Sequence, residues 1–352
     1  MCGIVGYVGP QGATPILMEG LARLEYRGYD SAGVAVLDAD RVIRIEKRAG
    51  KLSNLATVLA DVTLPGVQGI AHTRWATHGK PNDINAHPHQ DCTGDIALVH
   101  NGIIENYVEL REALRAQGHT FISETDTEIL AHLIEQETAD GTALAVATAR
   151  VLPRLRGAYA LVIMSRREPG VLVGARSNIP LIVGLGEHEN FFASDITALL
   201  RHTRRMVTLH DGELAVITPE AVRITTVAGQ TVQREAITVD WDAEMAEKGG
   251  YPHFLLKEML EQPDAVQRAL LGRIVPNDAG GLTTRLPEVA AWATPETLAG
   301  IQRIVLLACG TSYYASLIAR AMLERWARIP VDPWIASEFR YADPVIGPDC
   351  LV

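Results

Sequence analysis

The sequence MCGIVG at residues 1–6 places a cysteine directly after the initiator methionine. If Met1 is removed, Cys2 carries both a thiol and a free α-amine. Such an amine has a pKa of about 7.7–8.0, so it can act as a base near neutral pH. A nucleophile beside an N-terminal amine is a known catalytic arrangement, whereas a buried, inert cysteine at the start of a strand is the alternative interpretation.

The composition limits the class of protein. A chain of 352 residues is long enough for two domains, each with its own core. The formal net charge of -10 argues against a nucleic-acid-binding surface. The sequence contains no apolar run long enough to span a bilayer and no secretory signal pattern. The four cysteines are far apart and form no CxxC pair, which favours reduced thiols, so we expect a cytoplasmic protein.

Alternating strands and helices are predicted over residues 1–240. Residues 3–8 form a short apolar run that ends at Gly-Pro, which is typical of a buried strand. Thr125 and Glu128 match a capping box, and the apolar stripe that follows predicts a helix. Two blocks of strands with helices between them indicate sheet layers covered by helices.

The pattern changes after residue 240. Two helices separated by Pro263 are predicted over residues 254–271. Residues 275–300 are rich in Pro, Gly, Ala and Thr, so we expect a linker or a loosely packed connection there.

Residues 304–308 are continuously apolar, which is typical of a strand buried in a parallel sheet. A helix from about Tyr313 should follow, then a strand near Val331, and residues 350–352 look like the start of another strand. So few strands cannot bury both faces of a parallel sheet, so we expect this region to be part of a larger domain.

A polar loop with candidate binding groups is predicted at residues 71–79, AHTRWATHG. The guanidinium of Arg74 can grip a substrate carboxylate through two parallel hydrogen bonds. Thr77 and His78 can add further hydrogen bonds. An ordinary polar loop is an equally good explanation of the pattern.

Four histidines, His72, His78, His87 and His89, raise the question of a metal site. Their spacing is poor for a compact tetrahedral cluster, and no cysteine pair supports it. We therefore expect neither a metal nor another cofactor.

Asn101-Gly102 follows a predicted strand and is typical of a hairpin turn. The amide of Asn101 and the N–H of Gly102 are alternatively two suitable donors for an oxyanion hole. Asp126 at a predicted helix start interacts favourably with the helix dipole, or it holds a substrate ammonium. A thiol, an oxyanion hole, an arginine and an aspartate together describe a site for a free amino acid with a side-chain amide, which is glutamine.

Five segments in this order resemble the class II glutamine amidotransferases. They are CGIVG at 2–6, YRGYDSAG at 26–33, HTRWATHG at 72–79, HNGIIEN at 100–106 and ETDTE at 124–128. That family has the N-terminal-nucleophile hydrolase fold, an αββα sandwich. The resemblance implies this fold for residues 1–240.

The second half is similar to one branch of that class, the isomerising glutamine–fructose-6-phosphate aminotransferases. The segments concerned are KEMLEQP at 257–263, ACGTSY at 308–313 and ASEFRY at 336–341. The C-terminal half of that family contains two sugar isomerase domains. The resemblance implies a glutaminase domain at 1–240, a helical linker region at 241–300 and an incomplete first α/β sugar isomerase domain at 301–352.

The resemblance also implies roles for individual residues. Cys2 is expected to be the nucleophile, with Asn101 and Gly102 as the oxyanion hole. Arg74 and Asp126 are expected to hold the glutamine carboxylate and ammonium.

Other residues are expected to act around that site. Thr77 and His78 would lie near the glutamine, and Trp75 would lie in a mobile loop that gates ammonia passage. Arg27 would support the site without touching the substrate. Thr311 and Ser312 match the start of the sugar-phosphate site, although capping the following helix is the alternative.

Family members make glucosamine 6-phosphate from fructose 6-phosphate and glutamine in hexosamine biosynthesis, and homo-oligomers are expected. The resemblance implies no cofactor, no nucleic acid and no membrane partner. The family's second phosphate loop and its isomerising residues are absent from this sequence, so the chain looks truncated and is expected to retain only glutamine hydrolysis. The alternative is a catalytically silent regulatory or interaction subunit with the same fold.

Overall fold

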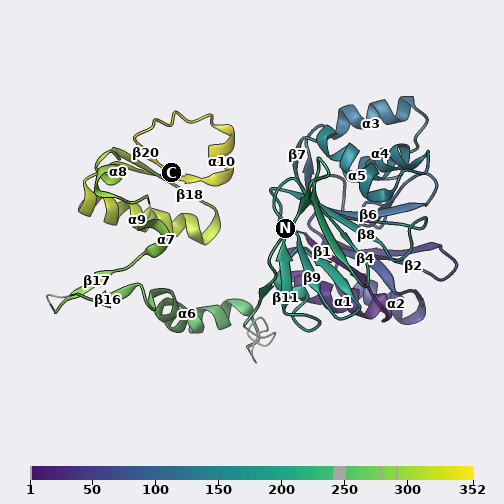
Figure 1. Ribbon diagram of the computed structural model, residues 1–352, viewed down its shortest axis with the longest axis horizontal. Coiled ribbons are helices and arrows are strands. Elements are labelled where there is room, and N and C mark those ends of the chain that lie inside the picture. The colour runs from purple at the N-terminus through teal and green to yellow at the C-terminus, as the bar shows by residue number, and fades with distance from the viewer. Residues whose placement is uncertain (1, 241–250, 278–279, 291) are drawn as a thin grey trace. The chain divides into compact units, whose positions relative to one another are not determined.

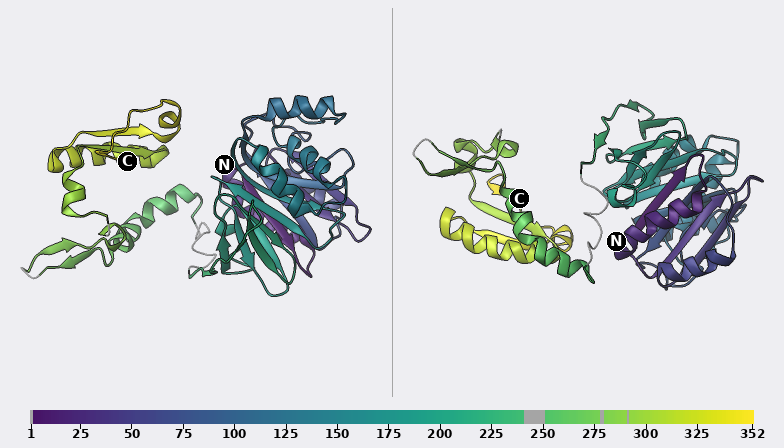
Figure 2. Two further views of the ribbon diagram at one scale, coloured as in Figure 1. Left: turned by 45° about the horizontal axis from the view of Figure 1, so that its top comes forward. Right: turned by 90° about the horizontal axis from the view of Figure 1, so that it is seen from below.

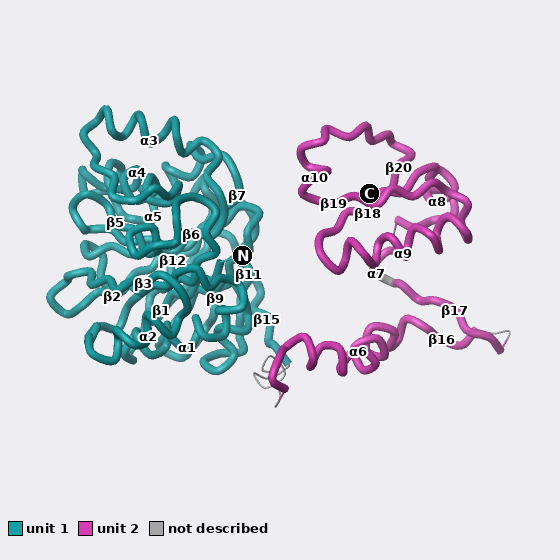
Figure 3. Tube along the Cα trace, turned by 180° about the vertical axis from the view of Figure 1, so that it is seen from behind, with its two compact units in different colours: residues 1–250 teal, residues 251–352 magenta. Residues whose placement is uncertain are grey.

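The computed structural model describes residues 2–240, 251–277, 280–290 and 292–352 (Figure 1). It divides into two compact units, residues 1–250 and 251–352 (Figure 3). Within the described ranges, no helix is both long and apolar enough to cross a membrane.

The first unit contains two antiparallel sheets. The larger has eight strands in the order β15-β11-β9-β10-β1-β4-β2-β3. Their bounds are Gly3–Val8 (β1), Ser31–Leu37 (β2), Ile43–Ala49 (β3), Gln68–Arg74 (β4), Ile182–Leu185 (β9), Asn190–Ala193 (β10), Arg205–Thr208 (β11) and Ile237–Thr238 (β15). All six residues of β1 are buried, which confirms the buried strand predicted at residues 3–8.

The second sheet has seven strands in the order β14-β13-β12-β8-β7-β6-β5. Their bounds are His89–Gln90 (β5), Ile96–Ile104 (β6), Gly157–Ser165 (β7), Leu172–Ser177 (β8), Glu213–Ile217 (β12), Val222–Thr226 (β13) and Thr231–Val232 (β14). Because β6 continues to Ile104, Asn101 and Gly102 lie within a strand. The hairpin turn considered for these two residues is therefore wrong.

Helices cover the outer face of each sheet (Figures 1 and 2). They are Ala13–Leu24 (α1) and Leu52–Asp61 (α2) on the larger sheet, and Tyr107–Ala116 (α3), Glu128–Thr138 (α4) and Leu144–Val151 (α5) on the other. Short 3-10 turns at Glu25–Arg27, Leu152–Arg154 and Ile196–Ala198 extend or connect these elements.

Three apolar cores hold these layers together, and each core lies between two neighbouring layers. Strand β1 contributes to two of them because its side chains alternate between its two faces. Val5 and Tyr7 pack in the core that contains α1 and α2, whereas Ile4 and Val8 pack between the two sheets. The layer order is the predicted αββα sandwich.

The start of α4 differs from its prediction. The residue before the helix, Thr127, makes no side-chain capping bond within the described residues. The carboxylate of Glu128 instead accepts hydrogen bonds from Ile122 N at 2.8 Å and from Ser123 N and Oγ, both at 2.6 Å. The capping box at Thr125 is therefore wrong, and Glu128 closes the preceding loop.

The second unit contains a hairpin, a small parallel sheet and helices. Its elements are Phe254–Leu270 (α6), Ile274–Pro276 (β16), Leu282–Thr284 (β17), Pro287–Ala290 (α7), Pro295–Ala299 (α8), Arg303–Ala308 (β18), Gly310–Ala327 (α9), Val331–Ile335 (β19), Ala336–Tyr341 (α10) and Cys350–Leu351 (β20). The parallel strands run in the order β19-β18-β20, which confirms the predicted parallel pairing.

Helix α6 contradicts the expectation of two helices. It continues through Pro263, although a proline inside a helix removes one backbone donor and crowds the carbonyl of the preceding turn. Part of the predicted linker is ordered, since β16, β17, α7 and α8 fall within residues 274–299. Residues 241–250, 278–279 and 291 of the expected linker region lie outside the described residues.

Candidate active site

Cys2 precedes the central strand β1, and its neighbours follow from the pairing of that strand. Gly3 lies opposite Thr73 in the β1–β4 ladder, so the chain beyond β4 passes the thiol. Trp75 N donates a hydrogen bond to Cys2 Sγ at 3.2 Å, and Trp75 O lies 3.5 Å from the same sulfur. Burial raises the pKa of the Cys2 thiol, while the bond from Trp75 N opposes that shift.

The side chain of Asn101 reaches Cys2 from the facing sheet. Its Nδ2 donates to Cys2 O at 3.1 Å, and its Oδ1 lies 3.0 Å from His72 Nε2. A carbonyl oxygen only accepts, so the amide nitrogen must face Cys2 and His72 Nε2 must carry the proton. Burial lowers the pKa of His72 to about 3, which keeps the ring neutral and the amide of Asn101 correctly oriented. Among the described residues, Cys2 O is the one acceptor recorded for Nδ2, which carries a second hydrogen.

Gly102 is required by its backbone geometry. Its φ is +122°, a conformation that residues with a Cβ rarely adopt. A Cβ at this position would lie 2.0 Å from Ala158 O on the neighbouring strand β7. The residue after Asn101 can therefore only be glycine if β6 and β7 are to pair as they do.

Arg74 ends β4 as a buried cation, and one nitrogen of its guanidinium lacks an acceptor among the described residues. Its Nη2 donates to His78 O and, at 3.4 Å, to Gly79 O. Its Nη1 is buried and has no hydrogen-bond partner among the residues that the structure describes. The side chain is 4% exposed, and burial lowers its pKa while Cys2 and Asp126 raise it. A buried guanidinium N–H without an acceptor is suited to an anionic ligand.

Asp126 supplies the opposite charge. It is 4% exposed, and its Oδ2 accepts a hydrogen bond from Ile104 N at the end of β6 at 2.8 Å. Its charge raises the pKa of Cys2, whereas the charge of Arg74 lowers it, so all three groups act on one another. The structure thus brings together Cys2, Arg74, Asn101 and Asp126.

The loop after β4 is held by the segment at residues 26–33. Asp30 N donates to Arg74 O at 3.0 Å, and Asp30 Oδ2 accepts from Ala76 N at 2.8 Å. A Cβ at Gly28 would lie 2.7 Å from the carbonyl carbon of Arg74. Sequence reasoning missed both residues, although they belong to the quoted segment YRGYDSAG, because only its charged Arg27 received a role.

The remaining residues predicted for the loop lie around Arg74. Trp75 is 46% exposed, and its ring meets Tyr29 edge-on with centroids 5.4 Å apart. Thr77 is exposed, with its Oγ1 3.4 Å from His78 Nδ1, and the His78 ring packs edge-on against Tyr107. His78 contacts Arg74 through its backbone carbonyl.

Arg27 contacts the chain that follows β10, beside β1. Its guanidinium pairs with Asp195 and lies 3.5 Å from Ser194 O. Ser194 Oγ in turn accepts a hydrogen bond from Ile4 N at 3.0 Å. Arg27 therefore positions a neighbour of β1.

Thr311 and Ser312 lie in the second unit, in the first turn of α9, and both are exposed. The residue that precedes the helix is Cys309, which makes no side-chain capping bond among the described residues. The alternative that Thr311 or Ser312 caps this helix is wrong because both lie inside it.

Three of the four histidines considered as metal ligands pack against one another in the interior, His72 and His87 stacked and His87 and His89 edge-on. The ring centroids of His72 and His87 are 4.2 Å apart, and those of His87 and His89 are 4.8 Å apart. Burial lowers the pKa of each ring. His89 Nε2 lies 3.1 Å from Thr125 Oγ1, and His87 Nδ1 accepts a hydrogen bond from His100 N at 3.4 Å. His72 Nδ1 has no hydrogen-bond partner among the described residues.

The chain is similar to known glutamine-dependent enzymes. Residues 60–234 match the sequence family described as a glutamine amidotransferase domain. The chain is 51% identical over 351 residues to the isomerizing glutamine–fructose-6-phosphate aminotransferase of Symbiobacterium thermophilum, covering 100% of this chain and 56% of that protein. It is also 51% identical over 346 residues to a protein of the same name from Thermus thermophilus, covering 98% and 55%. The chain thus spans about half the length of the curated relatives it matches.

A solved structure shows the same fold. The glutamine phosphoribosylpyrophosphate amidotransferase from B. subtilis superposes with a TM-score of 0.57 at 20% identity, covering 98% of this chain and 71% of that one. The αββα sandwich expected from the sequence is thereby confirmed.

Proposed function

Because this chain belongs to the class II glutamine amidotransferases, we propose that its first unit hydrolyses the side-chain amide of glutamine with Cys2 as the nucleophile. One observation carries the proposal: Asn101 Nδ2 donates to Cys2 O, while buried Arg74 and buried Asp126 shift the pKa of the Cys2 thiol in opposite directions through their charges. That set matches the groups of glutamine one by one.

Glutamine binding requires two opposite charges at one end of the ligand. Arg74 Nη1 is suited to donate to the α-carboxylate, since it is buried with no partner among the described residues. The carboxylate of Asp126 is suited to accept from the α-ammonium, because the hydrogen bond recorded for it among the described residues, from Ile104 N, is made to Oδ2. With both charged groups on the α-carbon held, the side-chain amide at the other end of the ligand extends toward Cys2.

Activation of Cys2 needs a base. Burial raises the pKa of the thiol above its ordinary value, so the resting group is protonated at neutral pH. We propose that removal of Met1, which lies outside the described residues, frees the α-amine of Cys2. This amine takes the thiol proton as Sγ attacks the amide carbon.

The tetrahedral oxyanion then forms beside Asn101. The second hydrogen of Nδ2 and the N–H of Gly102 are the proposed donors to it. Collapse breaks the carbon–nitrogen bond, and the protonated amine returns its proton to the departing ammonia. The resulting thioester at Cys2 is attacked by water, with the same amine as base, which releases glutamate.

The surrounding residues are assigned supporting roles in this proposal. Thr77 and His78 lie close enough to Arg74 to line the glutamine site, and the exposed ring of Trp75 covers it and gates ammonia passage. Arg27 holds the segment beside β1. Gly28 and Asp30 set the path of the loop that carries Trp75.

The second unit is proposed to begin a sugar isomerase domain at residues 301–352, after a linker region at 241–300. Thr311 and Ser312, at the N-terminus of α9, would contribute to its phosphate site. The longer protein would pass the ammonia to fructose 6-phosphate and make glucosamine 6-phosphate in the cytoplasm, as a homo-oligomer. Whole-chain similarity to relatives of that name supports this assignment.

Glutamate release from glutamine by the purified 352-residue chain tests the proposal. The variants are Cys2→Ala and, as a matched thiol control, Cys309→Ala, which removes an exposed cysteine of the second unit. Intact mass establishes the state of Met1 in each sample. We expect activity in the parent and in Cys309→Ala, none in Cys2→Ala, and no glucosamine 6-phosphate from any of them.

The opposite result is equally informative. If the parent chain is folded and lacks Met1 yet releases no glutamate, the proposal fails and the silent-subunit alternative is favoured. Activity that survives in Cys2→Ala would exclude Cys2 as the nucleophile.

A further inference from the structure

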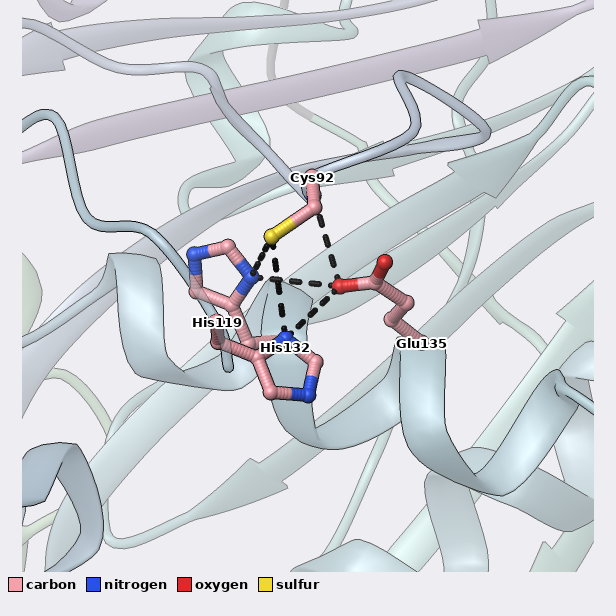
Figure 4. Close-up of side chains that lie close together, drawn as sticks. All are labelled: Cys92, His119, His132 and Glu135. Carbon is pink, nitrogen blue, oxygen red and sulfur yellow. Dashed lines mark hydrogen bonds and ion pairs between the residues drawn. The ribbon is translucent and has the colours of Figure 1, made fainter. Parts of the chain in front are cut away.

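Four side chains with metal-binding atoms meet in the first unit, at residues that have no role in the proposed glutaminase. They are Cys92 in the loop between β5 and β6, His119 after α3, and His132 and Glu135 on one face of α4 (Figure 4). Their ligand atoms all lie within 4.8 Å of one another. In Figure 4 all four point toward a common centre.

Four of the separations between ligand atoms are close to those around a single ion. Cys92 Sγ lies 3.7 Å from His119 Nδ1 and 3.5 Å from His132 Nδ1. Glu135 Oε2 lies 3.0 Å from the former nitrogen and 3.2 Å from the latter. Ligands at usual zinc distances on a tetrahedron are roughly 3.3–3.7 Å apart. The described contacts therefore need only small shifts to accommodate a tetrahedral ion.

We propose that Cys92, His119, His132 and Glu135 form a structural site for a divalent transition-metal ion, with zinc as the best fit. One thiolate and one carboxylate neutralise a divalent charge, and two neutral imidazoles complete the four ligands. Sulfur and nitrogen ligands favour zinc over magnesium or calcium, which prefer oxygen.

The surroundings of the cluster suit such a site. Thr120 N donates to Cys92 Sγ at 3.5 Å, as is appropriate for a thiolate. The outward ring nitrogen of His132, Nε2, lies 3.8 Å from the Glu128 carboxylate. A carboxylate behind a ligating histidine orients the ring and increases its basicity. Cys92 is exposed, so an ion has a path to the site, whereas the side chain of His132 is only 1% exposed.

The ion would tie together three segments that are distant in the sequence. These are the β5–β6 loop, the chain after α3 and the middle of α4. Asp126 lies just before α4, so the site would also stiffen the support of one proposed glutamine ligand. The site does not depend on the proposed activity, because none of its four residues touches the thiol of Cys2 in the described structure.

The metal content of the purified 352-residue chain tests the proposal. The chain is stripped with a chelator, reloaded with zinc, desalted and measured by elemental mass spectrometry, and a parallel sample is loaded with cobalt. We expect about one ion per chain and, with cobalt, the near-ultraviolet thiolate band and visible bands of a tetrahedral site.

Four variants locate the ion. Cys92→Ser and His119→Gln should lose the ion. Mutating a residue that only supports a metal ligand lowers metal affinity by roughly 10–100-fold, and we expect a larger drop when the ligand itself is replaced. Cys2→Ala should keep the ion, which excludes chelation by the N-terminal thiol and amine. His188→Ala is the matched histidine control, since His188 pairs with Glu220 on the surface of the same unit.

The folding of each variant is checked by circular dichroism without metal, so that loss of the ion is not confused with loss of structure. A rise in Tm on adding zinc, seen in the parent and absent from His119→Gln, would support the proposal. Failure of the parent to retain zinc, or an unchanged thiolate–cobalt band in Cys92→Ser, would overturn it. Loss of glutaminase activity alone would bear only on the proposed function.

Discussion

Replacing Asn101 by aspartate tests the proposed oxyanion site most directly. The substitution keeps the size and shape of the side chain and exchanges its NH₂ group for an oxygen. In the structure this group donates to Cys2 O at 3.1 Å, while the other end accepts from His72 at 3.0 Å. Asn101→Asp therefore keeps the bond from His72 and removes the donor that faces the nucleophile.

The expected magnitude follows from the chemistry of that position. Removal of one oxyanion donor typically lowers kcat by about 10²–10³, or about 2.7–4 kcal/mol. Asn101→Asp also places a buried negative charge where the oxyanion forms, so we expect a loss at or beyond the upper end of that range. KM should change only a few-fold, because the proposed contacts of Arg74 and Asp126 with glutamine are retained.

The assay is steady-state glutamate release, with kcat and KM determined separately. Asn106→Asp is the matched control, since the amide of Asn106 bonds to backbone atoms of Arg154 and Arg156, both at 3.0 Å, at a distance in sequence from Cys2 and Arg74. Alkylation of Cys2 shows whether the thiol remains accessible in Asn101→Asp. A loss of less than about 10-fold in kcat, in a folded variant with a reactive thiol, would refute the assignment.

Three further predictions concern the same site. In urea unfolding, Gly102→Ala should lower the free energy of unfolding by about 1–3 kcal/mol more than Gly118→Ala. Both glycines have positive φ, but only a Cβ at Gly102 would meet a carbonyl oxygen, at 2.0 Å. Equal losses of stability in the two variants would contradict this reasoning. Arg74→Met should lower kcat/KM by roughly 10–150-fold, mainly through KM, as expected for losing one charged hydrogen bond. Arg44→Met, which removes an arginine paired with a carboxylate elsewhere in the unit, should leave kcat/KM unchanged, and a similar loss in both variants would count against a carboxylate contact. The rate of glutamine hydrolysis should rise with pH as the α-amine loses its proton, with a midpoint at about pH 7.7–8.0. Burial raises the pKa of the Cys2 thiol, so a rate that rises only above pH ~9 would mean that the thiol ionises without help from the amine.

Local patterns predicted the layers of the first unit well. Strand β1 is apolar on both faces because it lies in the middle of a sheet between two cores, and that requirement is visible in six consecutive residues. Pro263 misled the prediction because propensity describes an isolated helix, and the structure retains α6 with one donor fewer. Glu128 misled it because the capping pattern gives only a spacing, whereas the carboxylate bonds to the loop before the helix.

In the candidate site, too, some features could be predicted from the sequence and others depended on the fold. The residue types of Cys2, Arg74, Asn101 and Asp126 are enough by themselves to indicate amide chemistry. The neutral His72 that orients the amide of Asn101 could not be assigned this way, because its role depends on a side-chain hydrogen bond between β4 and β6, which belong to different sheets. Gly102 was noted as a donor, but the reason that it must be glycine is the carbonyl oxygen of a neighbouring strand.

The cluster at Cys92 lies at the limit of sequence reasoning. Its ligands are separated by 27, 13 and 3 residues, so only the pair on α4 has a recognisable spacing. The sequence by itself determined the strand and helix periods and the chemical groups available, because backbone conformation and side-chain type are local properties. Tertiary structure alone decided which of those groups meet, because strand order and sheet stacking bring together atoms whose separation along the chain carries no signal.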